Sequence, residues 1–136
     1  MFEAAELGQS IPKDVYATEL PKLRERLLEA QRSLIQKKIP LILVIAGADG
    51  AGKSETVNRL HEWLDPRGLE TNVFGPLSDE ERDRPAYWRF WRTLPAKGRV
   101  GIFFGSWYTD PIVRRVYGES SRAELGSELA RIAAFE

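Results

Sequence analysis

The sequence predicts an α/β domain built in three layers, α/β/α, with helices on both faces of a parallel sheet. Residues 39–46 form a continuous apolar run rich in β-branched side chains, which is typical of a strand buried on both faces. The predicted elements also alternate along the chain as strand, helix, strand, helix, strand and helix. This alternation implies right-handed crossovers between parallel strands.

A first helix is predicted at residues 18–38, before the first strand. Its apolar residues recur every three or four positions, as in an amphipathic helix that covers a sheet: Leu20, Leu23, Leu27, Ala30 and Leu34. Residues 1–17 show no sustained period and contain Gly8 and Pro12, so we expect a leader arm there.

The region after the first strand predicts a second helix and a second strand. Val57, Leu60 and Leu64 recur at helical spacing, and the turn residues at 65–68 end that helix. Residues 69–74 then have the composition of a strand. Three strands are few for a doubly wound sheet, so we expect a domain truncated before its last strands.

The second half of the chain adds an aromatic helix, the third strand and a last helix. We expect the aromatic helix at residues 85–94, because proline is well suited to a first helical position. Residues 100–104 predict the third strand, and the loop after it is expected to face ligands. Ser121 and Glu124 have the spacing of a capping box at the start of the last helix.

Composition limits the classes of partner. The chain has 20 basic and 20 acidic side chains, so no global field attracts nucleic acid or an anionic membrane, and anion binding must be local. No apolar run approaches the roughly 20 residues of a membrane helix. The chain has no cysteine, which excludes thiolate metal sites and fits a reducing compartment; we expect a cytoplasmic protein.

A glycine-rich loop follows the first strand and matches the phosphate-binding pattern G-x-x-x-x-G-K-[ST] in full: Gly47, Ala48, Asp49, Gly50, Ala51, Gly52, Lys53 and Ser54. Such a loop aims backbone N–H groups and the positive end of a helix at phosphate oxygens. Lys53 is expected to neutralise the terminal phosphates and Ser54 to bind Mg²⁺. The fold class is therefore P-loop NTPase-like.

Asp49 lies inside this loop, where a carboxylate beside bound phosphates is repelled unless a metal ion or an acceptor's proton lies between them. Two interpretations stay open. Asp49 binds a metal or orients a phosphate acceptor, or it hydrogen-bonds the turn of its own backbone.

The loop and three later motifs closely resemble the type 2 polyphosphate kinase family: residues 65–68 (Asp-Pro-Arg-Gly), the aromatic stretch ending Leu94-Pro95, and Ser106-Trp107-Tyr108. The resemblance implies phosphoryl transfer between inorganic polyphosphate and AMP, ADP or ATP, with Mg²⁺. It implies catalytic roles for Asp49 and Lys53, metal binding by Ser54 and Asp49, and phosphate binding by Gly47, Gly50, Ala51, Gly52, Lys53, Ser54, Arg67 and Arg89. Residues 18–136 are then a partial P-loop kinase-like domain after the leader arm.

This chain departs from the family at the end of the third strand. The family pattern is Phe-Asp-Arg-Ser-Trp-Tyr, but Phe104 and Gly105 occupy the Asp and Arg positions. An aspartate there normally anchors Mg²⁺ beside the P-loop hydroxyl, so Phe104 removes a hard oxygen ligand. Asp110, six residues beyond Phe104, could replace this ligand only by reaching back along the loop. The family's lid helices are also expected to be missing.

These features favour three functional hypotheses. The first is a polyphosphate-dependent nucleotide kinase in which this chain is a degenerate or truncated N-terminal domain that contacts a second kinase-like domain. The second is an ATP-dependent nucleotide or small-metabolite kinase, and the third is a non-catalytic phosphate-binding or domain-interaction module. The aromatic residues are expected in the core, with some exposed and favouring a homo-oligomer: Trp63, Trp88, Trp91 and Trp107.

Overall fold

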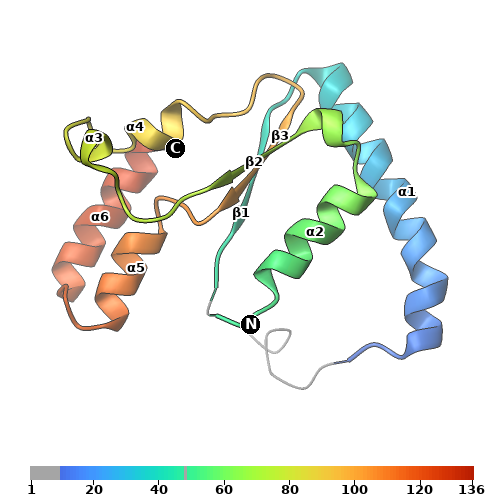
Figure 1. Cartoon of the computed structure of the whole chain (residues 1–136), viewed down its shortest axis with the longest axis horizontal. Helices are drawn as coiled ribbons and strands as arrows, with labels where there is room; N and C mark the ends of the chain where they lie inside the picture. Colours follow the sequence, from blue (N-terminus) through green and yellow to red (C-terminus); the bar gives the residue numbers. More distant parts are fainter. Residues whose placement is uncertain (1–9, 48) are drawn as a thin grey trace.

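The computed structural model describes residues 10–47 and 49–136, and its helices and strands alternate as the sequence predicts (Figure 1). The elements in chain order are α1 (Lys13–Lys37), β1 (Leu41–Ile45), α2 (Lys53–Trp63), the 3₁₀ helix η2 (Pro66–Gly68), β2 (Leu69–Val73), α3 (Asp79–Arg82), α4 (Trp88–Trp91), β3 (Val100–Phe104), α5 (Thr109–Val116) and α6 (Arg122–Phe135). No helix of the described ranges is both long and apolar enough to cross a membrane.

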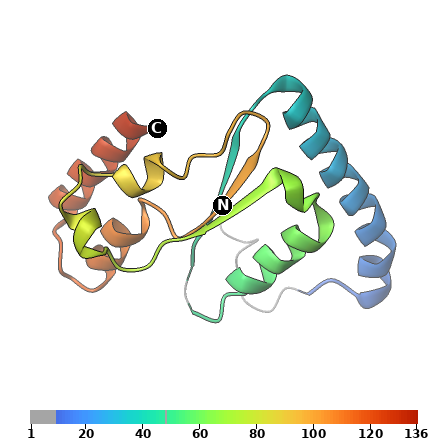
Figure 2. The ribbon, with the colours of Figure 1, turned by 45° about the horizontal axis from the view of Figure 1, so that its top comes forward.

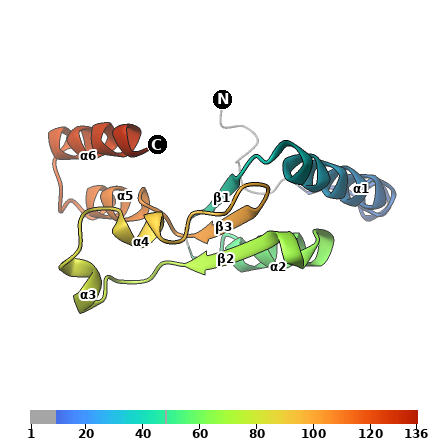
Figure 3. The ribbon, with the colours of Figure 1, turned by 90° about the horizontal axis from the view of Figure 1, so that it is seen from above.

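The three described strands form one parallel sheet in the order β1-β3-β2. Their register aligns Ile45, Phe104 and Val73, so the carboxyl ends of the strands lie at one edge of the sheet. Figure 3 shows α1 and α2 on one side of the strands and α4, α5 and α6 on the other. The predicted three-layer α/β/α fold is confirmed for this part of the chain.

Side chains of β3 alternate between two separate cores. Ile102 faces an aliphatic core, completed by Val57, Leu64, Leu69 and Val100. Phe103 faces an aromatic core, completed by Phe90, Trp107 and Ile132. Both central residues have an exposed fraction of 0%. The sheet therefore separates an aliphatic layer from an aromatic layer. Figure 2 shows α1 and α2 on one side of the strands and α4 and α6 on the other.

Helix α1 is joined to the rest of the aliphatic layer by Gln31, whose exposed fraction is 3%. The Gln31 side chain donates to the Asp65 carbonyl at 2.9 Å and accepts from the Asp65 N–H at 2.8 Å. Gly68 leaves room for it, because a Cβ there would lie 2.7 Å from Gln31 Nε2. One buried amide thus ties α1 to the turn before β2, in addition to the packing of Leu27 and Leu34 against the aliphatic core.

Two predicted helix boundaries are wrong. Helix α1 begins at Lys13 rather than at residue 18, so residues 13–17 of the expected leader arm are helical, while residues 1–9 lie outside the described ranges. The aromatic helix is limited to α4, because Tyr87 adopts a left-handed conformation with φ of 65° and interrupts it after Pro85. The capping box of Ser121 and Glu124 is present at the start of α6.

Candidate functional site

The glycine-rich loop leaves the carboxyl end of β1 and leads directly into α2, which begins at Lys53. Gly50 and Gly52 have φ values of 78° and 79°, a backbone conformation that side chains with a Cβ rarely adopt. Gly52 is the N-cap residue of α2. The predicted strand–loop–helix context is therefore present, and the positive end of α2 points at the loop.

Lys53 and Asp49 lie together in this loop. The Lys53 ammonium donates to the Gly47 carbonyl at 2.7 Å and lies 3.5 Å from Asp49 Oδ1. The side chain of Lys53 is largely covered, with 18% exposed, whereas that of Asp49 is fully exposed. A phosphate that binds here meets a cation already held over the loop by its backbone.

A hollow of about 460 Å³ lies over the loop, and we call it the loop pocket. It is lined by Asp49, Gly50, Ala51, Gly52, Lys53, Ser54, Glu55 and Phe104. Most of the predicted phosphate-binding residues are thus brought together. The oxygen atoms that could bind Mg²⁺ here belong to Ser54 and Asp49, and an ion of this kind commonly completes its shell with substrate phosphates and water.

The neighbouring strand contributes Phe104 to the loop pocket. Phe104 pairs in register with Ile45, the last residue of β1, so its side chain stands where the family's metal-binding aspartate is expected. Asp110 lines a different pocket and is not among the residues that line this one. Across the described ranges, no group of three or more His, Cys, Asp or Glu side chains could hold a metal by itself. A Mg²⁺ ion fits this loop only together with phosphate oxygens.

Gly105 follows Phe104 and has a φ of 86°. Its N–H donates to the Ile45 carbonyl at 3.1 Å. A Cβ at this position would lie 3.2 Å from the Phe74 carbonyl, which is closer than most real Cβ contacts. The backbone at Gly105 is therefore suited to glycine on two counts.

Arg67 lies at the opposite edge of the sheet from the loop, because it precedes β2 whereas the loop follows the parallel strand β1. Its guanidinium contacts the Asp65 carboxylate at 2.6 Å. This hydrogen bond lowers the pKa of Asp65 to about 2. The structure does not bring Arg67 together with the loop, and its phosphate-binding role stays a prediction without support from this arrangement.

Arg89 is held in place by three kinds of contact at the carboxyl edge of the sheet. It donates to the Gly75 carbonyl at 2.9 Å, lies 3.2 Å from Glu81 Oε1, and its guanidinium carbon lies 5.3 Å from the centre of the Phe74 ring. A hydrogen bond from the Ser78 N–H, together with the charge of Arg89, lowers the pKa of Glu81. Arg89 is thus ion-paired with Glu81, although its buried Nε makes no hydrogen bond of good geometry among the described residues.

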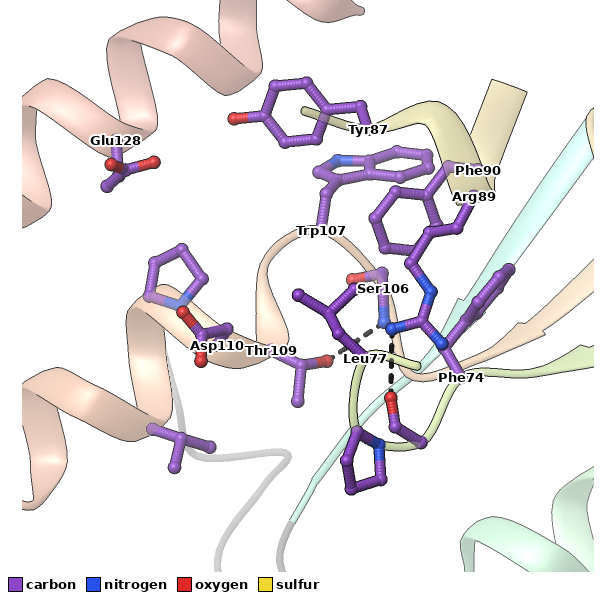
Figure 4. Close-up of a pocket in the computed structure, with 14 residues that line it drawn as sticks. Phe74, Leu77, Tyr87, Arg89, Phe90, Ser106, Trp107, Thr109, Asp110 and Glu128 are labelled. Carbon is purple, nitrogen blue, oxygen red and sulfur yellow. Dashed lines mark hydrogen bonds between the residues drawn. The ribbon is translucent and has the colours of Figure 1, made fainter. Parts of the chain in front are cut away.

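Arg89 lines a second hollow, of about 470 Å³, which we call the aromatic pocket (Figure 4). Its walls come from the segment after β2, from α4, from the loop after β3 and from α5 and α6: Phe74, Gly75, Pro76, Leu77, Tyr87, Arg89, Phe90, Ser106, Trp107, Thr109, Asp110, Pro111, Val113 and Glu128. Sequence analysis identified the loop after β3 as facing ligands, but missed Leu77 and Glu128, which no local pattern connects to it.

The family model described as polyphosphate kinase 2 matches residues 10–136. A polyphosphate:AMP phosphotransferase from Pseudomonas aeruginosa is 51% identical over 100% of this chain and 28% of its own length. A GDP-polyphosphate phosphotransferase from Mycobacterium tuberculosis is 32% identical over 98% of this chain and 45% of its own length. The chain thus spans less than half the length of either relative.

Two solved structures are also similar. A crystal structure of a putative polyphosphate kinase 2 from Pseudomonas aeruginosa superposes with a TM-score of 0.88 at 51% identity, over 99% of this chain and 29% of that one. A polyphosphate kinase 2 from Arthrobacter aurescens gives a TM-score of 0.81 at 31% identity, over 95% of this chain and 47% of that one.

Proposed function

The chain belongs to the polyphosphate kinase 2 family, and from this premise we propose that the whole protein transfers phosphoryl groups between inorganic polyphosphate and nucleoside mono- or diphosphates. The observation that carries the proposal is the phosphate-binding loop, which lies between β1 and α2 with Lys53 folded over it. The named activities of relatives at 51% and 32% identity support the same reaction class.

In this proposal the loop holds the phosphates at the transfer site. Backbone N–H groups of residues 50–54 face the phosphate oxygens, and Lys53 supplies a positive charge that stabilises the transferring group. Bound Mg²⁺ would neutralise negative charge on the phosphates. Ser54 and Asp49 are the residues that would hold this ion, since both line the loop pocket.

The aromatic pocket is the proposed site for the nucleoside part of the nucleotide. It lies at the same edge of the sheet as the loop, and β3 and the residues that follow it contribute to both pockets through Phe104 and Ser106. Aromatic walls and a few polar groups suit a flat, partly polar ligand. Polyphosphate and an AMP or ADP acceptor are therefore the proposed partners, and the cytoplasm the proposed location.

An assay without ATP tests this function. The longest natural protein that contains this chain is incubated with Mg²⁺, polyphosphate and AMP or ADP, and nucleotide products are separated by chromatography. We expect ADP or ATP to form from polyphosphate, and Lys53→Ala to abolish the share contributed by this domain. If product forms from ATP but not from polyphosphate, the protein is an ATP-dependent kinase instead.

A second candidate function is a non-catalytic domain that binds phosphate chains and contacts a catalytic kinase-like domain. Phe104 favours it, because an apolar ring lines the loop pocket where a metal ligand is expected. We would inactivate any second domain and compare the unchanged domain with Phe104→Asp and with Phe104→Asp/Gly105→Arg. Activity that appears only after restoration supports a non-catalytic natural domain, whereas activity in the unchanged domain contradicts it.

A further inference from the structure

Arg89 is the one cation in the described wall of the aromatic pocket, so an anionic group bound there depends on its guanidinium (Figure 4). Only 15% of the Arg89 side chain is exposed, and only 21% of the Glu81 side chain with which it pairs. Every other ion pair between described residues has at least one partner that is far more exposed. Water and salt therefore screen the charge of Glu81 at Arg89 only weakly.

The contact between Glu81 and Arg89 is close but poorly aligned. Arg89 Nε lies 3.2 Å from Glu81 Oε1, yet this buried N–H makes no hydrogen bond of good geometry to the described residues. Arg89 Nη1 donates to the Gly75 carbonyl at 2.9 Å, and this is the one hydrogen bond of the Arg89 side chain within the described ranges. The guanidinium therefore keeps N–H groups for a ligand, while Glu81 already compensates its charge.

Both residues would stay anchored if a ligand came between them. Glu81 Oε2 accepts a hydrogen bond from the Ser78 N–H at 2.9 Å, as part of the capping box of α3. Arg89 is held by the Gly75 carbonyl, and its guanidinium carbon lies 5.3 Å from the centre of the Phe74 ring. None of these contacts uses the attraction between the two charges. A ligand that replaces Glu81 at Arg89 therefore needs neither the loss of α3 nor a new position for the arginine.

We propose that Glu81 competes with the phosphate group of a nucleotide for Arg89, and that it thereby limits how much more tightly the aromatic pocket binds a nucleotide than the corresponding nucleoside. Glu81 is not among the wall residues, so it acts on the ligand through Arg89 rather than by contact. The inference rests on the proposed function, because it requires a nucleotide in this pocket. It gives Glu81 control over the affinity for phosphate and none over the choice of base.

The test compares AMP with adenosine, which lacks only the phosphate group, in calorimetric binding to the 136-residue chain. Glu81→Gln removes the competing charge and keeps the capping box, because glutamine serves at the same position of this motif. We expect the ratio of AMP affinity to adenosine affinity to rise roughly tenfold, with adenosine binding unchanged. Glu80→Gln is the matched control on the same helix. Glu80 is exposed and pairs with Arg84, so its loss should change the ratio by less than about twofold.

Further variants assign the effect to Arg89. Arg89→Met should lower the ratio of AMP affinity to adenosine affinity, and adding Glu81→Gln to Arg89→Met should not raise it again. Near-ultraviolet circular dichroism shows whether each variant is folded. If Arg89→Met alone is not, the double variant gives the reading, because it removes both charges of the enclosed pair and leaves neither without a partner. Lys53→Ala changes the loop pocket and should leave the effect of Glu81→Gln unchanged.

Three results would overturn the inference: AMP fails to bind, Glu81→Gln leaves the ratio unchanged or lowers it, or Glu80→Gln raises the ratio as much. A rise that persists without Arg89, or that disappears in Lys53→Ala, would also overturn it, since the phosphate would then bind elsewhere. Tripolyphosphate binding, with Lys53→Ala as its control, is measured on the same samples. If it depends on Lys53 while Glu81→Gln has no effect on AMP, the inference fails and the phosphate-loop proposal stands. Tripolyphosphate binding that does not depend on Lys53 contradicts the loop proposal itself.

Discussion

The aliphatic and aromatic layers on the two sides of the sheet are built from different side chains and leave different surfaces. Branched aliphatic residues pack under α1 and α2, where Gln31 completes the contact by hydrogen bonds to Asp65. Aromatic rings pack under α4 and α6, where Phe103 and Trp107 meet edge to face with centres 5.9 Å apart. The rings reach the carboxyl edge of the sheet and become pocket walls there.

This difference separates the two proposed tasks. The phosphate loop is continuous with the aliphatic layer through β1 and α2, and in the proposal it binds phosphate mainly through backbone groups and Lys53. The aromatic pocket works through side chains from segments far apart in the sequence. Changes in one layer should therefore affect one ligand more than the other.

The largest expected effect comes from Phe103→Ala at the centre of the aromatic layer. Phe103 is fully buried, and truncation leaves a cavity, so we expect a loss of about 3–5 kcal/mol in the free energy of unfolding. Urea unfolding followed by circular dichroism measures it. Ile102→Ala is the counterpart on the aliphatic side. Among molecules that stay folded, Phe103→Ala should weaken adenosine binding more than tripolyphosphate binding; equal weakening would contradict two separable layers.

Gln31→Ala tests the aliphatic layer. The change leaves two partly buried backbone groups of Asp65 without their partner, so we expect a loss of about 1–3 kcal/mol. Gln36→Ala, an exposed position on the same helix, is the matched control and should change stability little. Similar unfolding curves for the two variants would show that α1 is held by other contacts.

Gly105→Ala tests the junction between the layers. The alanine must adopt a φ of 86° and lie close to the Phe74 carbonyl, so we expect a loss of about 1–2 kcal/mol. Gly118 has a φ of 75° with open space around its missing Cβ, so Gly118→Ala isolates the backbone cost. Gly105→Ala should cost more than Gly118→Ala, and the difference measures the crowding at Phe74.

Lowering the pH should reduce the free energy of unfolding through Asp65, which lies on the aliphatic side of the sheet. Its folded pKa of about 2 lies below the ordinary value of 3.8, so its contribution to stability is present above pH 3.8 and is lost as the pH falls toward 2. Chemical unfolding at several pH values should show a shallower acid dependence for Asp65→Asn than for the unchanged chain. Because this pair is exposed, we expect a small effect, and parallel pH profiles would contradict it.

Raising the pH should lower the stability of the folded chain through Tyr108, which lies on the aromatic side of the sheet. This is the smallest effect that we expect. The Tyr108 hydroxyl donates to Glu136 Oε1 at 2.8 Å, and this bond and charge raise the pKa of the phenol. The stabilisation is complete below the unfolded pKa and is lost as the pH rises through the folded one. Tyrosinate absorbance should show that Glu136→Gln lowers the pKa of one tyrosine. If the tyrosine titration is the same in both proteins, the hydrogen bond between Tyr108 and Glu136 does not raise this pKa.

The sequence predicted the parts of the molecule that depend on local patterns. The apolar run at residues 39–46, the complete motif ending in Lys53 and the capping box at Ser121 each contain their own signal, and each lies in the expected element. The position of Phe104 beside the loop was also predictable, because parallel strands end at the same edge. These features require only short-range chemistry and sheet topology.

Other features depend on packing between distant segments. Glu128 reaches the aromatic pocket from α6, and its spacing along that helix does not distinguish it from a solvated charge. The left-handed conformation of Tyr87 gave no signal in an aromatic stretch that otherwise predicts a helix. Arg67 illustrates a different limit: resemblance suggested a phosphate ligand, although its place just before a strand already indicates the far edge of the sheet.

The backbone at Gly105 makes the departure from the family motif hard to reverse. Any side chain introduced there must accept a positive φ and a close approach to the Phe74 carbonyl, so an arginine at this position carries a stability cost. Phe104→Asp alone would add a carboxylate to a loop pocket whose described wall already holds Asp49, Glu55 and one cation, Lys53. Restoring the full motif would therefore combine a strained backbone at position 105 with added negative charge beside the loop.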